Sequence, residues 1–297
     1  MKCLNIIKSK EDKAFKYIFK LDTNLIVEAT FIDKNDGKYI ICMPNQTGCK
    51  MGCKFCYLSD LKNLKVNNVK EEELNYIVDY ILEDLNVVEN IKNNNKQLLL
   101  SFMGSGEPLC NYKNLLYCVK YCSNKYGNVR GAIATIMNDF KTFNDFSNKI
   151  EQLGLDIKVH LSMHYTNDVD RKEWMPNCGE LKESIEQLKR YKGKKEIHYT
   201  LIKDINDKQE DIQFLIDNFK NNEDITIKFI RFNPKDSSSS IGTKKERIQE
   251  IVELMKANMS NPIEVYTPPA SDIGGSCGQF LLDYYKEYNL QIVKSVL

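Results

Sequence analysis

Short β-rich runs alternate with segments of helical apolar spacing along most of the chain, and this alternation restricts the possible folds more than any other feature. The predicted strands beyond the first forty residues are Gln97–Phe102, Ala132–Ile136, Ile157–Met163, Glu196–Ile202, Ile225–Phe232 and Ile263–Thr267. The predicted helices include Glu71–Val88, Asn114–Cys122, Leu181–Tyr191, Asp207–Phe219 and Lys245–Met255. Strand–helix units of this kind favour a parallel sheet with crossover helices. About six units are too few for a complete eight-stranded barrel, so we expect an α/β fold with a partial (β/α)6 TIM-like barrel.

The N-terminal residues follow a different pattern, in which strands come without helices between them. Two β-rich runs, Ala14–Leu21 and Leu25–Ile32, flank the turn signal Asp22-Thr23-Asn24, and a third run, Tyr39–Met43, follows. We therefore predict two parts. Residues 1–44 form a small N-terminal β-hairpin extension, and residues 45–297 form the barrel with a C-terminal loop and helix.

Composition and charge exclude several classes of protein. No apolar run is long enough to cross a bilayer, and the start of the chain lacks the apolar region of a signal peptide, so we expect a cytoplasmic protein without membrane contact. Lys and Arg number 42 against 41 Asp and Glu, a net charge of +1, which gives no support to a nucleic-acid partner. Ten cysteines in such a chain favour metal or redox chemistry over a disulfide framework.

Three of these cysteines stand within eight residues of each other. The segment from Gly48 to Cys56 has the spacing C-x3-C-x2-C, with ligand candidates Cys49, Cys53 and Cys56. Three thiolates at this spacing suit a cuboidal iron–sulfur cluster, and the iron without a protein ligand can chelate the amine and carboxylate of S-adenosylmethionine (SAM). This pattern is typical of radical SAM enzymes. A zinc site with a fourth ligand elsewhere is the alternative, although no second C-x2-C pair is present.

Further motifs follow the cysteine loop in a fixed order. They are Met103-Gly104-Ser105-Gly106-Glu107-Pro108-Leu109, His160-Leu161-Ser162-Met163-His164, Phe232-Asn233-Pro234 and Ser276-Cys277-Gly278-Gln279. Together with the strands Phe15–Leu21 and Val27–Ile32, they resemble the RlmN/Cfr family of radical SAM methyltransferases, which methylate adenosine in ribosomal RNA and, in some members, tRNA. The joint order and spacing of the motifs carry this resemblance.

The resemblance implies a chemical role for two further cysteines. In the family, a cysteine in the place of Cys277 receives a methyl group from one SAM. A second SAM, bound to the [4Fe–4S] cluster, yields a 5′-deoxyadenosyl radical that removes a hydrogen atom from the methyl-cysteine. The S-methylene radical adds to an adenine carbon, and a thiol in the place of Cys42 releases the product, leaving a disulfide. Glu28 resembles the proton acceptor, and its alternative is a solvent-facing residue of an amphipathic strand.

The same resemblance implies a set of SAM contacts. The family's cofactor-binding positions correspond here to Gly106, Glu107, Ser162, Met163, His164 and Asn233. A glycine at a strand end lets the backbone approach a ligand, and a glutamate can accept a hydrogen bond from the SAM ammonium. The electron donor implied is a flavodoxin or a ferredoxin. His160, His198 and the cysteines outside the motifs are predicted to be structural; for Cys42 the alternative is a core residue of its strand.

The chain also departs from the family pattern, which bears on the substrate. About a dozen residues precede the hairpin, where the family carries an N-terminal helical accessory domain, so we expect a shortened member. The segment before Cys277 is basic in the family, whereas the corresponding residues here, Glu264–Ala270, include no basic residue. After the cysteine loop, Tyr57–Asp60 replaces a run of small residues. Ala134 replaces a serine that contacts SAM in the family.

Three functional hypotheses follow. The first is a radical SAM methyltransferase that acts on an adenine carbon, by default in rRNA or tRNA. The second is a related radical SAM enzyme that acts on a nucleotide-sized, metabolite or peptide substrate. The third is a non-catalytic iron–sulfur or zinc binding module.

Overall fold

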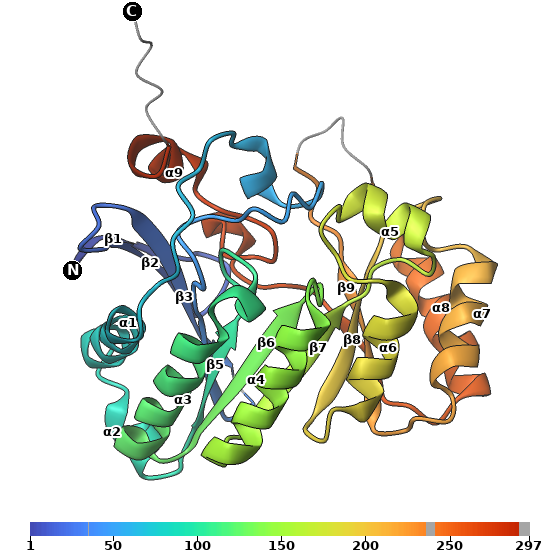
Figure 1. Ribbon diagram of the computed structural model, residues 1–297, viewed down its shortest axis with the longest axis horizontal. Helices are drawn as coiled ribbons and strands as arrows, with labels where there is room; N and C mark the ends of the chain where they lie inside the picture. Colours follow the sequence, from blue (N-terminus) through green and yellow to red (C-terminus); the bar gives the residue numbers. More distant parts are fainter. Residues whose placement is uncertain (35, 236–240, 291–297) are drawn as a thin grey trace, which may run out of the picture.

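The computed structural model describes residues 1–34, 36–235 and 241–290, and its centre is one mixed sheet whose strand order follows the chain (Figure 1). The strands are β1 (Lys2–Lys8), β2 (Ala14–Lys20), β3 (Ile26–Lys34), β4 (Lys38–Cys42), β5 (Gln97–Phe102), β6 (Val129–Thr135), β7 (Ile157–Ser162), β8 (Lys195–Leu201), β9 (Ile225–Arg231) and β10 (Ile263–Tyr266). Strands β1 to β4 pair antiparallel, and β4 to β10 pair parallel. Because β1 and β10 are its edges, the described sheet does not close on itself.

The described helices are α1 (Glu71–Asp84), α2 (Val88–Lys92), α3 (Tyr112–Tyr126), α4 (Phe140–Leu153), α5 (Asp168–Trp174), α6 (Leu181–Arg190), α7 (Gln209–Phe219), α8 (Lys245–Asn258) and α9 (Leu282–Tyr288). Helices α1 to α8 connect the parallel strands and lie along one face of the sheet, whereas α9 follows the last strand and contacts β3 (Figure 1). Short 3-10 segments are η1 (Tyr57–Asp60), η2 (Pro108–Asn111) and η3 (Ser271–Ile273). The six units that begin at β4, β5, β6, β7, β8 and β9 confirm the predicted partial barrel. Strand β10 was predicted as Ile263–Thr267, and the added parallel strand is β4, which the sequence analysis had assigned to the N-terminal extension.

The N-terminal strands are continuous with the barrel sheet. Strand β4 pairs antiparallel with β3, where Phe31 faces Ile41, and parallel with β5, where Ile41 faces Leu100. The structure also adds β1 to the predicted hairpin, which makes it a meander. The sequence did not predict β1 because Lys2–Lys8 is largely exposed and lacks a clear alternation; pairing with β2 forms this strand.

Two helices were also missing from the sequence prediction. Helix α4 buries Phe143, Phe146 and Ile150, which have helical spacing, and its first turn is capped by the Asp139 carboxylate, which accepts from the Thr142 N–H at 2.7 Å. Helix α5 is only seven residues long and has little periodicity to detect. Both lie between strands that the sequence did predict, so the topology was still correctly inferred.

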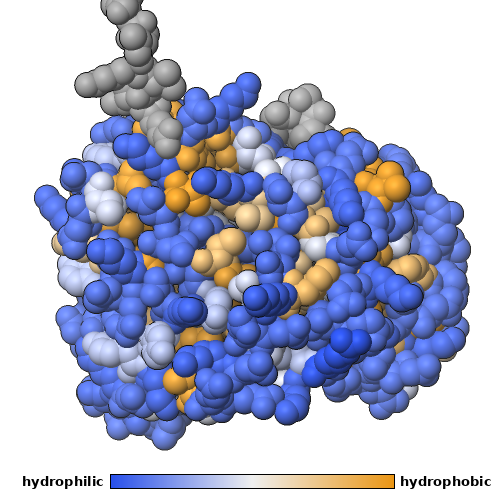
Figure 2. All heavy atoms as spheres, viewed as in Figure 1, coloured by the Kyte–Doolittle hydropathy of each residue, from blue (hydrophilic) through white to orange (hydrophobic). Residues whose placement is uncertain are grey.

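The surface of the molecule is polar. The face in Figure 2 is mostly hydrophilic, in keeping with the 28% of charged residues. Within the described ranges, no helix combines the length and apolar character that crossing a bilayer requires.

Arg171 of α5 is fully buried and holds the ends of β6 and β7 in place. Its Nε donates to Met163 O and one terminal nitrogen to Ile136 O, both at 3.2 Å, and the other terminal nitrogen donates to Gly179 O. These carbonyls belong to three segments that surround the carboxyl ends of the strands. A buried guanidinium bonded to backbone carbonyls therefore fixes the loops from which a site at that edge is built.

We expect Arg171→Met to lower the free energy of unfolding by about 3 kcal/mol or more, because it leaves several buried carbonyls without a donor. Urea denaturation measures this value. Arg130→Met is the matched control: Arg130 pairs with the half-exposed Asp156, so its loss should cost less than about 1 kcal/mol. Equal losses in the two variants would contradict this account of Arg171.

Candidate active site

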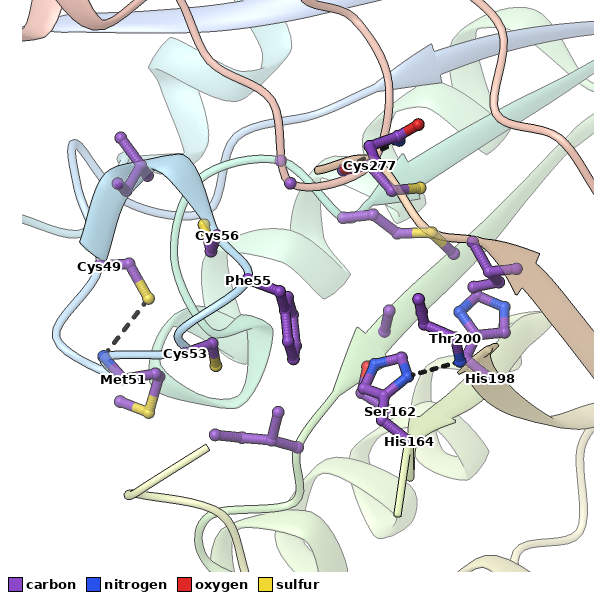
Figure 3. A pocket seen from close by; sticks show the side chains of 18 of the residues that line it. Cys49, Met51, Cys53, Phe55, Cys56, Ser162, His164, His198, Thr200 and Cys277 are labelled. Atoms are coloured by element: carbon purple, nitrogen blue, oxygen red, sulfur yellow. Dashed lines mark hydrogen bonds between the residues drawn. The ribbon is translucent and has the colours of Figure 1, made fainter. Parts of the chain in front are cut away.

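The three cysteines of the C-x3-C-x2-C loop line one cavity at the carboxyl edge of the parallel strands. Figure 3 shows the side chains of Cys49, Cys53 and Cys56 around the same loop. Burial, and then the neighbouring thiols Cys56 and Cys49, raise the pKa of Cys53 well above its usual value, and burial raises that of Cys49 to about 12. The three sulfurs are therefore close enough to repel each other as thiolates.

This donor set fits an iron–sulfur cluster with three protein ligands. Buried thiolates that lie this close need a cation between them, and metal coordination supplies it. Gly52 has φ +72°, a left-handed conformation that turns the loop between the first two cysteines. The Met51 N–H donates to Cys49 Sγ at 3.4 Å, a contact of the kind that orients a coordinating sulfur.

Most of the predicted cofactor-binding residues line the same cavity. Gly106, Glu107, Ser162, His164 and Asn233 are in its wall with the three cysteines. The Met163 side chain is instead fully buried in the core among the apolar residues behind the sheet, because it alternates with Ser162 along the chain. Ala134, the place of the substituted serine, also lines the cavity.

Gly106 and Glu107 form the end of the loop that follows β5. Gly106 has φ +90°, and a Cβ there would lie 2.7 Å from the Gln46 side chain, so a larger residue does not fit. The buried Glu107 carboxylate accepts from Leu109 N, Ile136 N and the Thr135 hydroxyl. Burial raises the pKa of Glu107 to about 7, which these hydrogen bonds oppose. An ammonium ligand in the cavity would stabilise the ionised carboxylate.

His164 and Asn233 are held by contacts from neighbouring strands and loops. His164 Nδ1 accepts from Thr200 N at 3.1 Å, and its ring packs edge-on against Phe55 with centroids 5.2 Å apart (Figure 3). Burial lowers the pKa of His164 to about 3, so the ring is neutral. The Asn233 amide donates to Cys277 O at 3.3 Å, which ties the loop after β9 to the C-terminal cysteine.

Cys277 lies between this cavity and a second one. It lines both, while Cys42 and Glu28 line the second. Burial and then the charge of Cys277 raise the pKa of Cys42 to about 12, and burial raises that of Cys277 to about 11. The structure thus brings together the three residues predicted to be catalytic, although they are far apart in the sequence.

Glu28 is engaged by two partners. Its side chain is only 4% exposed and forms an ion pair with Lys16, and its Oε1 accepts from the Leu281 N–H at 2.8 Å. The sequence analysis did not select Lys16. The available signal was a lysine flanked by apolar residues in the middle of Ala14–Lys20, beside a strand that carries a single buried glutamate.

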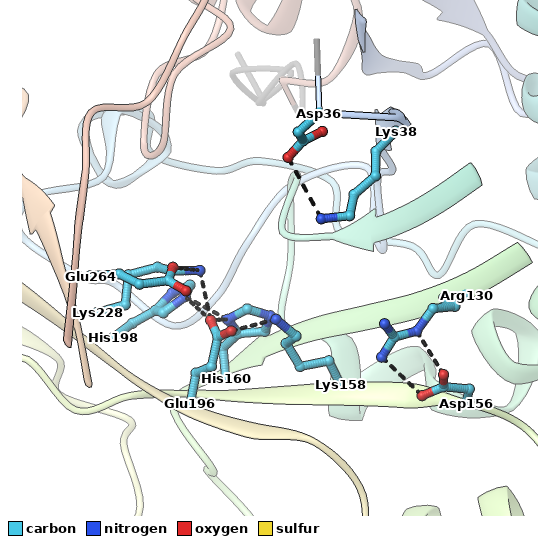
Figure 4. Close-up of polar contacts among 10 residues, drawn as sticks. All are labelled: Asp36, Lys38, Arg130, Asp156, Lys158, His160, Glu196, His198, Lys228 and Glu264. Atoms are coloured by element: carbon cyan, nitrogen blue, oxygen red, sulfur yellow. Dashed lines mark hydrogen bonds and ion pairs between the residues drawn. The ribbon is translucent and has the colours of Figure 1, made fainter. Parts of the chain in front are cut away.

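The opposite wall of the second cavity is ionic. Inward-facing residues of β7 to β9 bring His160, Glu196, His198 and Lys228 together (Figure 4). Glu196 Oε2 lies 3.0 Å from His160 Nδ1 and 2.7 Å from Lys228 Nζ, and Lys158 pairs with the other oxygen. Although the two imidazoles and the carboxylate converge as metal ligands do, two ammonium groups already neutralise Glu196. A divalent cation would be repelled there.

The segments that depart from the family pattern also have defined partners. Segment η1 replaces the small-residue run, and Lys235 Nζ bonds Ser59 Oγ and Asp60 Oδ1, each at 2.7 Å. In β10, Glu264 pairs with Lys228 at 3.1 Å, and Tyr266 faces the second cavity. These contacts lie beside the predicted site and leave its cysteines in place.

Comparisons with known proteins agree with this geometry. The family model described as the radical SAM superfamily matches residues 43–216. A probable dual-specificity RNA methyltransferase RlmN of Clostridium botulinum strain Alaska E43 is 30% identical over 295 residues, covering 95% of this chain and 79% of the relative. The dual-specificity RNA methyltransferase RlmN of Aliarcobacter butzleri is 29% identical, covering 93% and 79%. A solved radical SAM methyltransferase from Sphaerobacter thermophilus has a similar fold, with a TM-score of 0.78 at 20% identity, covering 94% of this chain and 80% of that one.

We expect Cys49→Ala, Cys53→Ala and Cys56→Ala each to prevent formation of a stable cluster, because each removes one of three ligands. Anaerobic reconstitution with iron and sulfide, followed by iron analysis, should give about four irons per wild-type chain and far fewer in each variant. Cys110→Ala and Cys178→Ala are the controls and should retain wild-type iron. Retention of four irons by any loop variant would contradict the ligand assignment.

Proposed function

Since the chain belongs to the radical SAM superfamily and, within it, to the RlmN family, we propose that it methylates an adenine carbon of an RNA through a methyl-cysteine intermediate. The chain is a radical SAM methyltransferase, and such enzymes use a [4Fe–4S] cluster and SAM. One observation supports the proposed route more than any other. Cys42 and Cys277 line one cavity, and Cys277 also lines the cavity of the three loop cysteines.

The residues that line the cavity of the three loop cysteines hold the cofactors. Cys49, Cys53 and Cys56 ligate the cluster, and Gly106, Glu107, Ser162, His164 and Asn233 surround SAM, whereas Met163 takes no part. When bound, the cluster and SAM supply an electron and a 5′-deoxyadenosyl group that abstracts hydrogen. The Glu107 carboxylate, fixed by three donors, is suited to receive the SAM ammonium.

Cys277 has the role of carrying the methyl carbon to the substrate. As a thioether it presents its methyl group where the two cavities meet. After loss of a hydrogen atom, its methylene carbon bonds to the adenine carbon. The covalent bond to Cys277 holds the methylene carbon next to an adenine carbon that is a poor partner for polar methyl transfer. It also replaces a bimolecular encounter between methyl donor and substrate.

Cys42 has the role of releasing the product. The adduct gives one electron back to the bound cluster, which was oxidised when it supplied its electron, and the substituted adenine carbon loses its proton. The Cys42 thiolate then attacks the Cys277 sulfur, so that a sulfur–sulfur bond forms and the sulfur–carbon bond breaks. The electron pair of the broken bond stays on the methylene carbon, which takes up a proton to become the methyl group. Glu28, in the same cavity, stays the predicted acceptor of the substrate proton. A dithiol reductant then restores the two thiols.

The RNA substrate is inferred from the relatives' activities. Lys34 and Lys38 line the second cavity and are suited to phosphate groups. A nucleotide-sized substrate is the second candidate. The segment that is basic in the family carries Glu264 here, which pairs with Lys228, so this segment lacks the positive charge that would contact RNA. We further propose that the electron donor is of the flavodoxin or ferredoxin type. We also propose that the chain divides into residues 1–44 and residues 45–297, with Cys42 at the end of β4 in the first part.

We expect Cys277 of the anaerobically purified protein to carry a methyl group, and Cys42→Ala to accumulate a covalent adduct between Cys277 and RNA. The substitution removes the thiol that breaks the tether while leaving the earlier steps intact. Peptide mass spectrometry detects both products, and sequencing of the attached RNA identifies the substrate.

Cys110→Ala, a control outside both roles, should behave as the wild type, and Cys277→Ala should yield neither methyl group nor adduct. An unmodified Cys277 in a protein that holds its cluster and cleaves SAM would overturn the methyl-cysteine route. A protein that binds iron but never cleaves SAM would indicate a binding module.

A further inference from the structure

Lys16 is a buried cation with an unusual position. Its side chain is only 2% exposed, in the middle of a strand whose neighbouring residues are apolar. Lysines are rarely this buried, because removing an ammonium from water is costly unless it is paired. Lys16 is paired with Glu28 and donates to Gly274 O at 2.6 Å. Its ammonium is therefore held inside the protein at the wall of the second cavity.

The ion pair between Lys16 and Glu28 holds both ends of the loop that carries Cys277. Lys16 bonds the carbonyl of Gly274, three residues before Cys277, and Glu28 accepts from the N–H of Leu281, four residues after it. Within the loop, Gly275 N donates to Ala270 O at 2.7 Å. The loop is thus attached at two points, to β2 and to β3, and β3 is the strand that pairs with β4 and its Cys42.

Lys16 also acts on Cys42 through its charge. Burial and then the charge of Cys277 raise the pKa of Cys42, and the Lys16 ammonium acts in the opposite direction. Strand β5 contributes the uncharged Ser101 to this cavity, and Met103 follows it. The other titratable groups that line the cavity are Glu28, Lys34, Asp36, Lys38, Lys158, His160, His198, Lys228, Glu264, Tyr266 and Cys277. A thiol must ionise to attack sulfur, so a cation in the same cavity favours the attacking form.

We propose that Lys16 is the positioning residue of the release step, holding the Cys277 loop next to Cys42 and supplying positive charge to the cavity that Cys42 lines, from two strands away across Thr30. This inference rests on the proposed methyl-cysteine route. The step is the attack of the Cys42 thiolate on the Cys277 thioether sulfur, in which the sulfur–sulfur bond forms and the carbon keeps the electron pair of the broken bond and is protonated. Two electrons and two protons from a dithiol then reduce the disulfide.

The test uses two substitutions that separate the two parts of this role. Lys16→Met removes both the charge and the hydrogen bond to Gly274 O. Lys16→Gln removes the charge but keeps an N–H donor, and it also serves if Lys16→Met fails to fold. Lys195→Met is the matched control: Lys195 is also buried, pairs with Asp224 at 2.8 Å and donates to two backbone carbonyls, at the start of β8.

The first measurement does not depend on turnover. Cluster-loaded protein is alkylated with iodoacetamide over a range of pH, and labelling of Cys42 is followed by peptide mass spectrometry. In both Lys16 variants we expect the midpoint of Cys42 labelling to rise by about one pH unit, which is a tenfold loss of thiolate at neutral pH. Lys16→Arg should restore the wild-type midpoint, and Lys195→Met should leave it unchanged.

The second measurement is the decay of the RNA adduct in a single turnover. Both Lys16 variants should still form methylated Cys277 and cleave SAM, and their adduct should decay about tenfold more slowly than in the wild type. Lys16→Met should be slower than Lys16→Gln, because it also releases the loop.

Unchanged Cys42 labelling in both Lys16 variants would overturn the inference, whatever the activity. Slow adduct decay in Lys195→Met to the same extent would also overturn it, since general loss of packing would then explain the effect. Failure of the proposed function is a separate outcome: the wild type would lack methylated Cys277, while the labelling comparison would still decide the role of Lys16.

Discussion

The hydrogen bonding of β4 on both of its sides is the constraint on which the arrangement of the site depends. On one side β4 continues the antiparallel meander, and on the other it begins the parallel sheet. Cys42 ends this strand, and the cysteine loop begins a few residues later. Because parallel strands place their carboxyl ends at one edge, the loops after β5, β7 and β9 meet the cysteine loop there. The meander meanwhile provides the surface on which the C-terminal loop rests.

The sequence predicted what depends on local pattern and missed what depends on long-range contacts. Strands such as Gln97–Phe102 and helices such as Leu181–Tyr191 carry their own apolar periodicity, and the cysteine spacing is complete within nine residues. Strand β1 forms only because β2 lies beside it. Met163 and Ser162 were both predicted to bind cofactor, yet alternation along the chain places their side chains on different faces.

The site shows the same division. Cys42, Glu28 and Cys277 were selected through resemblance, and the structure places all three in one cavity. The role of Lys16 could not be predicted from the sequence, because it depends on partners that lie 12 and 258 residues away along the chain. The near-zero net charge likewise did not indicate how many charged side chains lie inside the protein. Inside the barrel, Lys158, Lys228, Glu196 and Glu264 balance one another, so strong local fields coexist with a neutral sum.

The attachment of the Cys277 loop to the N-terminal strands has a consequence for the order in which the molecule assembles. The bond from Leu281 to Glu28 spans 253 residues, and contacts of such separation form late, after local units have folded. A partly folded chain therefore keeps Cys42 and Cys277 far apart, while the cysteine loop, with its ligands within eight residues, is already complete. The thiol pair is thus brought together by the completed tertiary fold and not by any local segment of the chain.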